Sequence, residues 1–212
     1  MFRYFENLID PYAPYEETDH PPQKLLPFLW SYCRPFKRVF IWATVMSVVV
    51  ATVEVGLIWA MGWVVDILSG TPDTVWADHG TALIALAVFI LLVRPVIQAV
   101  DVLILNNAVL PNMGTIVRWR AHKHVLRQSV GWFENDFAGR IANRVMQTPR
   151  SAGEVIYHVF DAFSYIVAYL VGALFLLLNA EMELIIPLLL WMFAYGYLIV
   201  FVVKRIQPAS QA

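Results

Sequence analysis

Charged residues are scarce in this sequence: they make up 15% of its 212 residues, whereas hydrophobic residues make up 59%. A soluble globule of this length needs more charged and polar side chains to cover its surface. The composition therefore predicts that much of the surface faces lipid. A single cysteine, Cys33, excludes an internal disulfide. The formal net charge of -1 argues neither for nor against a nucleic-acid partner.

Lysine and arginine are absent from most of the long apolar stretches. Fourteen of the fifteen lie before residue 39, between residues 118 and 150, or at residues 204 and 205. Basic residues that flank membrane helices stay on the cytoplasmic side, so this distribution predicts a membrane protein with both termini in the cytoplasm. The connections at residues 69–80 and 179–183 are short, acidic and free of lysine and arginine, as turns on the outer side should be.

Four apolar runs are long enough to cross a bilayer, which takes about 20 mostly apolar residues in a helix. They lie at residues 39–68, 81–105, 155–178 and 184–203. The last run contains no charged residue at all. The sequence therefore predicts an all-α, polytopic membrane protein with four transmembrane helices.

Residues 106–154, between the second and third spans, are predicted to be cytoplasmic and largely helical. Residues 115–128 and 140–147 consist mostly of types that helices tolerate, so spans two and three should continue as helices beyond the membrane. Some twenty extra residues would carry each helix about 30 Å into the cytoplasm. Pro111 and Pro149 are candidates for kinks in these extensions.

The N-terminal region divides into two parts. Residues 1–22 are acidic and lack the apolar core of a signal peptide, so we expect a disordered or loosely attached cytosolic arm. Residues 23–38 place apolar side chains at helical spacing beside basic ones. Such an elbow helix can lie in the headgroup layer; the alternative is a cytosolic extension of the first span. The transmembrane domain is then expected at residues 39–206, with 207–212 as the C-terminal end.

Large aromatic side chains gather at the turn of the cytoplasmic segment, far from lipid. The residues concerned are Trp132, Phe133, Glu134, Asn135, Asp136, Phe137 and Gly139. An exposed aromatic cluster with a polar rim generally marks a docking site for a soluble partner. The alternative is that the rings only pack between the two helical extensions.

These features together resemble the transmembrane domain of ATP-binding-cassette (ABC) exporters of the bacterial multidrug and lipid type. The resemblance lies in the elbow, the aspartate closing span one (GWVVDIL), and the segment SVGWFENDFAGRIANRV. In that family, S-x-x-F-F-(D/E) follows span two, then a glycine and an arginine-containing helix. Ser129, Phe133, Glu134, Gly139 and Arg144 fit this pattern, with Trp132 in place of the first phenylalanine. The likeness covers residues 23 to about 206 but departs at MQTP (residues 146–149), where an aspartate is expected.

The resemblance implies that residues 132–137 are the first coupling helix, resting on an ABC nucleotide-binding domain. The family has six spans followed by an ATPase cassette, whereas four spans are found here. No G-x-x-x-x-G-K-[ST] motif occurs, so ATP and Mg are expected on a nucleotide-binding domain outside this chain.

The resemblance further implies a homodimer in the bacterial inner membrane that moves hydrophobic or amphiphilic substrates outward. The alternative is a stand-alone four-helix scaffold or accessory protein that binds another cytosolic partner. An importer permease is disfavoured because no E-A-A-type loop is found.

Ionisable residues within the spans are costly in lipid and should face protein or water. These are Glu54, Arg94, Asp101, His158 and Asp161. They are candidates for the translocation pathway; the alternative is that they form pairs that hold helices together. Arg94 has two candidate partners: Asp101, two helical turns away, or a residue on another helix.

Other patterns carry less information. His122 and His124 point to different faces of a helix, so no metal site is predicted there. The basic and aromatic run IVRWRAHKHVLR lies beside the cytoplasmic membrane face, where lipid headgroups or a protein are better partners than nucleic acid. No serine, histidine and aspartate are arranged for catalysis, so no catalytic residue is assigned.

Overall fold

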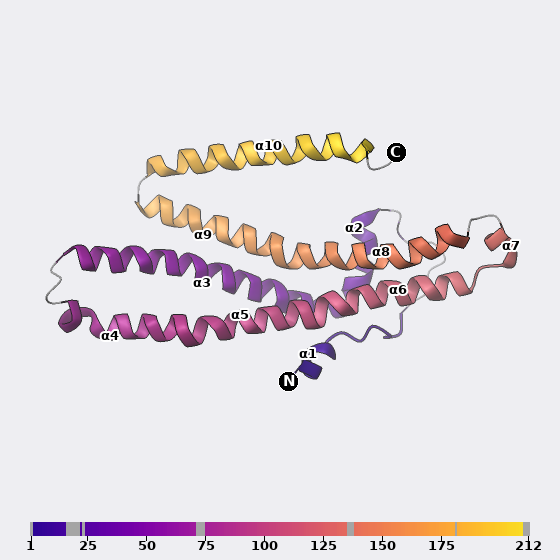
Figure 1. Cartoon of the computed structure of the whole chain (residues 1–212), viewed down its shortest axis with the longest axis horizontal. Helices are drawn as coiled ribbons and strands as arrows, with labels where there is room; N and C mark the ends of the chain where they lie inside the picture. Colours follow the sequence, from indigo (N-terminus) through magenta and orange to yellow (C-terminus); the bar gives the residue numbers. More distant parts are fainter. Residues whose placement is uncertain are drawn as a thin grey trace. The chain divides into compact units, whose positions relative to one another are not determined.

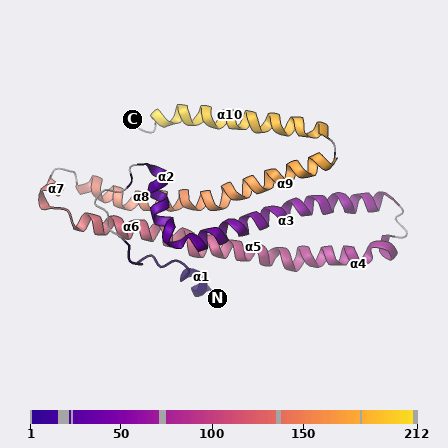
Figure 2. The same cartoon turned by 180° about the vertical axis from the view of Figure 1, so that it is seen from behind.

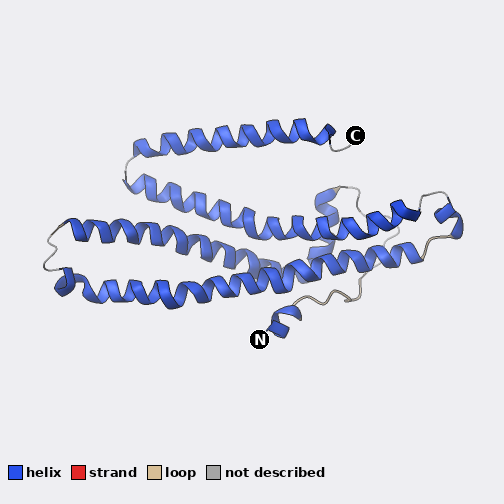
Figure 3. Ribbon diagram, in the orientation of Figure 1, coloured by secondary structure: helices blue, strands red, loops and turns tan. Residues whose placement is uncertain are grey.

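The computed structural model describes residues 2–15, 22, 24–70, 75–134, 138–180 and 182–209. Every regular element in this part of the chain is helical, as predicted (Figures 1 and 3). The chain forms two compact units, residues 1–169 and residues 170–212. The first holds the buried core and is described first.

Four helical stretches are long and apolar enough to cross a membrane, which confirms the predicted number. They cover Leu25–Ser69, Val75–Leu126, Gly139–Ala180 and Ile185–Ile206. Only the first has an appreciable buried share in its most apolar window, 28%, and the others have none. Such exposure of apolar side chains is expected of helices whose solvent is lipid.

The first stretch changes direction near its start. Helix α2 (Leu25–Cys33) ends at the 3-10 turn η1 (Arg34–Phe36), and α3 (Lys37–Ser69) follows. Pro35 lies in this turn, and a proline cannot continue the hydrogen-bond ladder of the preceding helix. As a result α2 runs across the direction of α3 (Figures 1 and 2).

The second stretch is one continuous rod made of five segments. These are α4 (Val75–Val88), the π-helical turn η3 (Phe89–Val93), α5 (Arg94–Leu103), the π-helical turn η4 (Ile104–Val109) and α6 (Leu110–Leu126). The outer turn predicted at residues 69–80 is thus too long, because α4 already begins at Val75. The Trp63 ring of α3 contacts the His79 ring of α4 edge to face, with the ring centroids 5.9 Å apart. This contact holds the start of α4 against α3.

Both π-helical turns of this rod precede a proline. Pro95 and Pro111 lack an amide hydrogen, and their rings crowd the carbonyl groups four residues earlier, at Leu91 and Asn107. Those carbonyls lie inside η3 and η4. The wider turn relieves the crowding, so the rod continues through each proline instead of breaking.

A second rod returns beside the first. It begins after the short α7 (Val130–Glu134) and consists of α8 (Ala138–His158), the π-helical turn η5 (Val159–Phe163) and α9 (Ser164–Ala180). Helices α6 and α8 approach closely where two glycines meet: a Cβ on Gly153 would lie 3.3 Å from the backbone nitrogen of Gly114. Pro149 lies inside α8 and is buried without ending it.

The buried core lies at the end of the predicted spans that the sequence analysis assigns to the cytoplasmic side, where α2, α3, α6 and α8 meet. Its members are Ile9, Leu29, Tyr32, Cys33, Phe40, Val109, Met113, Ile116, Val117, Ala152 and Ile156. Ile9 belongs to the N-terminal arm and is 0% exposed. A second, smaller cluster contains Ala43, Ile104 and Leu105, with Phe5 of the arm packed against it.

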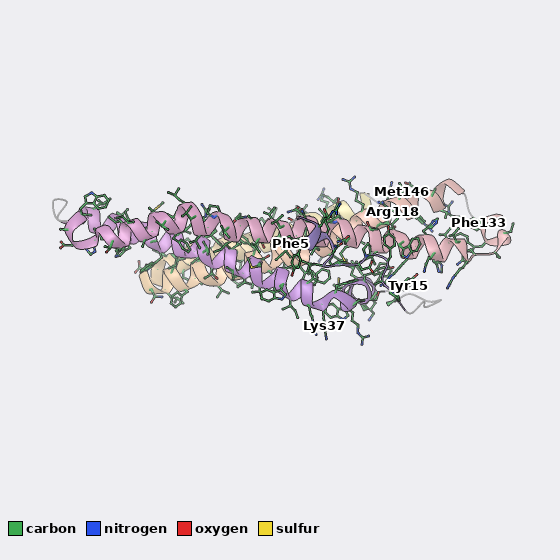
Figure 4. All side chains as sticks on the ribbon, turned by 90° about the horizontal axis from the view of Figure 1, so that it is seen from below. Phe5, Tyr15, Lys37, Arg118, Phe133 and Met146 are labelled. Carbon is green, nitrogen blue, oxygen red and sulfur yellow. The ribbon has the colours of Figure 1, made fainter. Side chains whose placement is uncertain are left out.

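The expectation of a disordered or loosely attached arm is therefore wrong for residues 3–15. The Asn112 side-chain amide donates a hydrogen bond to the Glu6 carbonyl at 2.9 Å. The Arg120 guanidinium lies over the Tyr15 ring, 4.2 Å from its centroid. Figure 4 shows Phe5 and Tyr15 beside the long helices rather than projecting away from them. Composition concealed this docking because the arm's few apolar residues are scattered among acidic ones and prolines.

The second unit contains the end of α9, the 3-10 turn η6 (Met182–Leu184) and α10 (Ile185–Ala209). No side chain that is described in α10 is buried. Its outward apolar surface fits the uncharged span predicted at residues 184–203.

Candidate functional site

A polar cavity of about 260 Å³ lies within the first unit, between α3, the second rod and the middle of the first rod. It is lined by Val50, Glu54, Gln98, Asp101, Val102, Leu105, Asn106, Tyr157, Asp161 and Tyr165. All of these except Asn106 belong to spans predicted from the sequence. A polar cavity at membrane level is costly unless its groups find partners, which marks it as a candidate for function.

Three of the five ionisable residues singled out in the spans meet at this cavity: Glu54, Asp101 and Asp161. Arg94 borders it through Glu54. His158 does not line it; this side chain is exposed, with its ring 5.4 Å from that of Tyr157. The sequence pointed to the charged members but not to Gln98, Asn106 or Tyr157, since these residue types carry no signal without knowledge of which helices meet.

Arg94 forms an ion pair with Glu54 across two helices. Its Nη2 and Nε atoms lie 2.7 Å and 3.2 Å from Oε1 of Glu54. Of the two alternatives left open, pairing with another helix is thus correct, and pairing with Asp101 is wrong. The pair compensates the charge of Glu54, which would otherwise be exposed to a medium of low dielectric constant.

Asp101 has no such compensation. It is 6% exposed, and its Oδ1 has no hydrogen-bond partner among the described residues. Asp161 is close enough for its charge to act on the Asp101 carboxylate. Buried polar atoms are nearly always hydrogen-bonded, so this unpartnered carboxylate oxygen needs an explanation.

Asp161 is positioned by α3. Ser47 is 1% exposed, and its hydroxyl lies 3.5 Å from Oδ1 of Asp161 and 3.1 Å from the Ala43 carbonyl. The hydroxyl also lies 3.5 Å from the Phe160 carbonyl, so it connects α3 with η5. One lining carboxylate is therefore fixed by contacts between helices, whereas the other lacks a partner on one oxygen.

Of the three π-helical turns in the described residues, two contribute to the cavity wall. Leu105 and Asn106 belong to η4, and Asp161 belongs to η5. Single π-helical turns inside long helices occur frequently at functional sites, because the inserted residue re-aims neighbouring side chains. Their position here supports the same cavity as the functional centre of this unit.

The second candidate site is the aromatic tip between α6 and α8. Trp132 and Phe133 are 37% and 40% exposed, and their rings meet edge to face at 5.1 Å. Figure 4 places Phe133 near the far end of the helical extensions. Both rings are thus partly exposed at the tip.

The rest of this tip is described only in part. Residues 135–137, and the side chain of Glu134, lie outside the described residues. Gly139 is the second residue of α8, and a Cβ at this position would meet nothing within 4 Å. The predicted docking role of these residues stays a prediction.

Comparisons with known proteins agree with this architecture. Residues 40–212 match the sequence model of the family described as "ABC transporter transmembrane region". The whole chain is similar, at 25% identity over 214 residues, to a Haemophilus influenzae protein named "Uncharacterized ABC transporter ATP-binding protein". The chain spans 34% of that relative's length. No solved structure matches the chain.

Proposed function

This chain belongs to the family of ABC transporter transmembrane regions, and on that premise we propose that it forms part of the membrane pathway of an ATP-driven exporter of hydrophobic or amphiphilic molecules. One observation carries the proposal: α6 runs from the cavity wall to Leu126, α8 runs from Ala138 back to the cavity wall, and the aromatic tip lies in the connection between them. Residues 106–126 alone amount to about 30 Å of helix. A movement imposed at the tip is therefore passed to the cavity wall by rigid secondary structure.

In this proposal the exposed rings of Trp132 and Phe133 dock into a nucleotide-binding domain. ATP bound there with Mg would supply the free energy for closing and reopening the dimer. The role of this chain is mechanical. Helices α6 and α8 pack closely at Gly114 and Gly153, so they move together. Because η4 directly precedes α6 and η5 directly follows α8, Asn106 and Asp161 move with these helices.

The outward apolar surfaces of α9 and α10 support the lipid bilayer as the surrounding medium. The proposed assembly is a homodimer in a bacterial inner membrane, with both termini of this chain on the cytoplasmic side. An accessory scaffold would also expose apolar helices, but it has no need for a polar cavity connected to a docking tip.

The test is Phe133→Ala in the complete transporter that contains this chain, reconstituted in liposomes. We expect ATP-dependent transport to fall at least tenfold, with ATP hydrolysis no longer stimulated by substrate, because removal of a central aromatic anchor typically costs 2 kcal/mol or more of docking energy, roughly thirtyfold in affinity. The control is Met146→Ala, an exposed position on α8. Wild-type transport and stimulation in the Phe133 variant would refute the coupling role.

A further inference from the structure

We propose that the docked N-terminal arm (residues 3–15) restrains the movement of α6 and thereby slows ATP hydrolysis by the complete transporter when no substrate is present. The proposal rests on the export function, because it concerns how the movement that the aromatic tip passes to the cavity is regulated. The arm can act in this way because it is attached to several helices at once.

The first half of the arm is attached around η4, beside the cavity. Helix α1 (Phe2–Glu6) packs against this π-helical turn. Phe5 packs against the smaller buried cluster, which joins η4 to α3 through Ala43. The Glu6 carbonyl accepts the hydrogen bond of the Asn112 side chain, 2.9 Å away in the first turn of α6. This half of the arm therefore holds α3, η4 and the start of α6 together.

The second half of the arm is attached to α6 and, through it, to the elbow helix α2. The Arg120 guanidinium of α6 lies 4.2 Å from the ring centroid of Tyr15 in the arm and 4.7 Å from that of Tyr32 in α2. A guanidinium over an aromatic face is attracted by the ring. The Tyr12 and Trp119 rings add an edge-to-face contact at 5.3 Å. One side chain of α6 thus joins the arm to the elbow.

The two attachments are separated along α6, and the arm is also fixed between them. Asn112 and Arg120 are eight residues apart, about 12 Å of helix. Figure 4 shows Tyr15 nearer to the aromatic tip than Phe5. Ile9 lies between them in the sequence and is 0% exposed within the main buried cluster. The arm therefore runs along α6 from η4 toward the tip and is held at both ends and in the middle.

The sharing of contacts decides what the arm can do. An arm attached to one rigid helix would be carried along with it and would oppose no movement. This arm packs against α3, η4 and α6 and is joined to α2 through Arg120, so a shift of α6 against the other elements breaks some contacts. Contacts that one conformation keeps and another loses shift the equilibrium toward the first by the difference in their free energy. The docked arm therefore stabilises the present arrangement, and its release makes other arrangements more accessible.

The experiment measures two quantities in the complete transporter in lipid nanodiscs. These are ATP hydrolysis without substrate, and hydrogen exchange at the Asn7 and Leu8 amides, which reports opening of the arm. Tyr15→Ala should raise both about fivefold, because a partly exposed cation–π contact contributes about 1 kcal/mol. Phe5→Ala, at the other end, should also raise both. Tyr15→Phe keeps the aromatic ring and should match the wild type. The matched control is Tyr4→Ala, whose side chain is 70% exposed in the same arm.

Faster exchange with wild-type hydrolysis in Tyr15→Ala and Phe5→Ala would overturn the proposal, because the arm would then only hold the fold together. A fall in hydrolysis in these two variants would overturn it as well. ATP-driven transport of the amphiphilic dye ethidium is scored separately in liposomes. Raised hydrolysis and exchange in the variants, without dye transport by the wild type, would overturn the export function but support the restraint. Dye transport by the wild type with equal hydrolysis in all variants would do the reverse.

Discussion

Docking of the N-terminal arm gives a quantitative prediction. Ile9 is fully buried against the core at the junction of α2, α6 and α8. Truncating a buried isoleucine to alanine costs about 2–5 kcal/mol, and an arm that can relax around the change should lie at the low end. A loss of about 2 kcal/mol shifts the equilibrium between docked and undocked arm by roughly 30-fold.

Hydrogen exchange measures this shift directly. The amides of Asn7 and Leu8 donate to the carbonyls of Arg3 and Phe5 at 3.2 Å, so they exchange when the arm opens. In Ile9→Ala we expect their exchange to accelerate about 30-fold, while amides in the middle of α6 change little. Leu26→Ala removes a side chain that is 76% exposed and serves as the control. Equal exchange rates in Ile9→Ala and wild type would refute the inference that Ile9 anchors the arm.

Two further predictions concern contacts between helices. Gly153→Leu should lower the melting temperature of the purified transporter, because its Cβ would approach the Gly114 backbone to 3.3 Å and overpacking typically costs about 1–3 kcal/mol. The control Gly139→Leu places its side chain in open space and should leave the melting temperature unchanged. Equal melting temperatures of the two variants would contradict the close approach. Arg94→Gln should destabilise the protein more than the double variant with Glu54→Gln, since the single change leaves an uncompensated carboxylate. Additive effects in a double-mutant cycle of thermal unfolding would show that the pair contributes nothing.

The spans could be predicted because they follow from properties that the sequence displays locally. Apolar length and the sorting of lysine and arginine depend on the bilayer, not on which helices meet. The helical extensions were predictable for the same reason: residues 115–128 and 140–147 favour a helix without reference to a partner. The structure confirms four long helices, with bounds that extend beyond the apolar runs.

Contacts between helices were harder to predict. A Cβ on Gly56 or Gly196, two glycines within the spans, would meet nothing within 4 Å. The close approach is at Gly114 and Gly153. Both lie in polar stretches of the sequence, where a glycine alone does not indicate close packing of helices. Pairing of Arg94 likewise depended on how α3 and α5 align. Register between helices is a tertiary property, and no single helix encodes it.

The π-helical turns have a consequence for how the first rod is compared with related sequences. Each turn accommodates one extra residue, which rotates everything after it by about 100° relative to an uninterrupted α-helix. The extra residues in η3 and η4 therefore shift the helical register of the rod twice. An α-helical pattern of apolar residues that is counted from α4 to α6 without allowing for these shifts assigns the wrong residues to the inward face. A one-residue deletion within either turn restores ordinary helical phase downstream while presenting a different set of side chains to α8. A one-residue gap at such a turn in an alignment therefore changes which side chains face inward, and is not simply a change in the length of the rod.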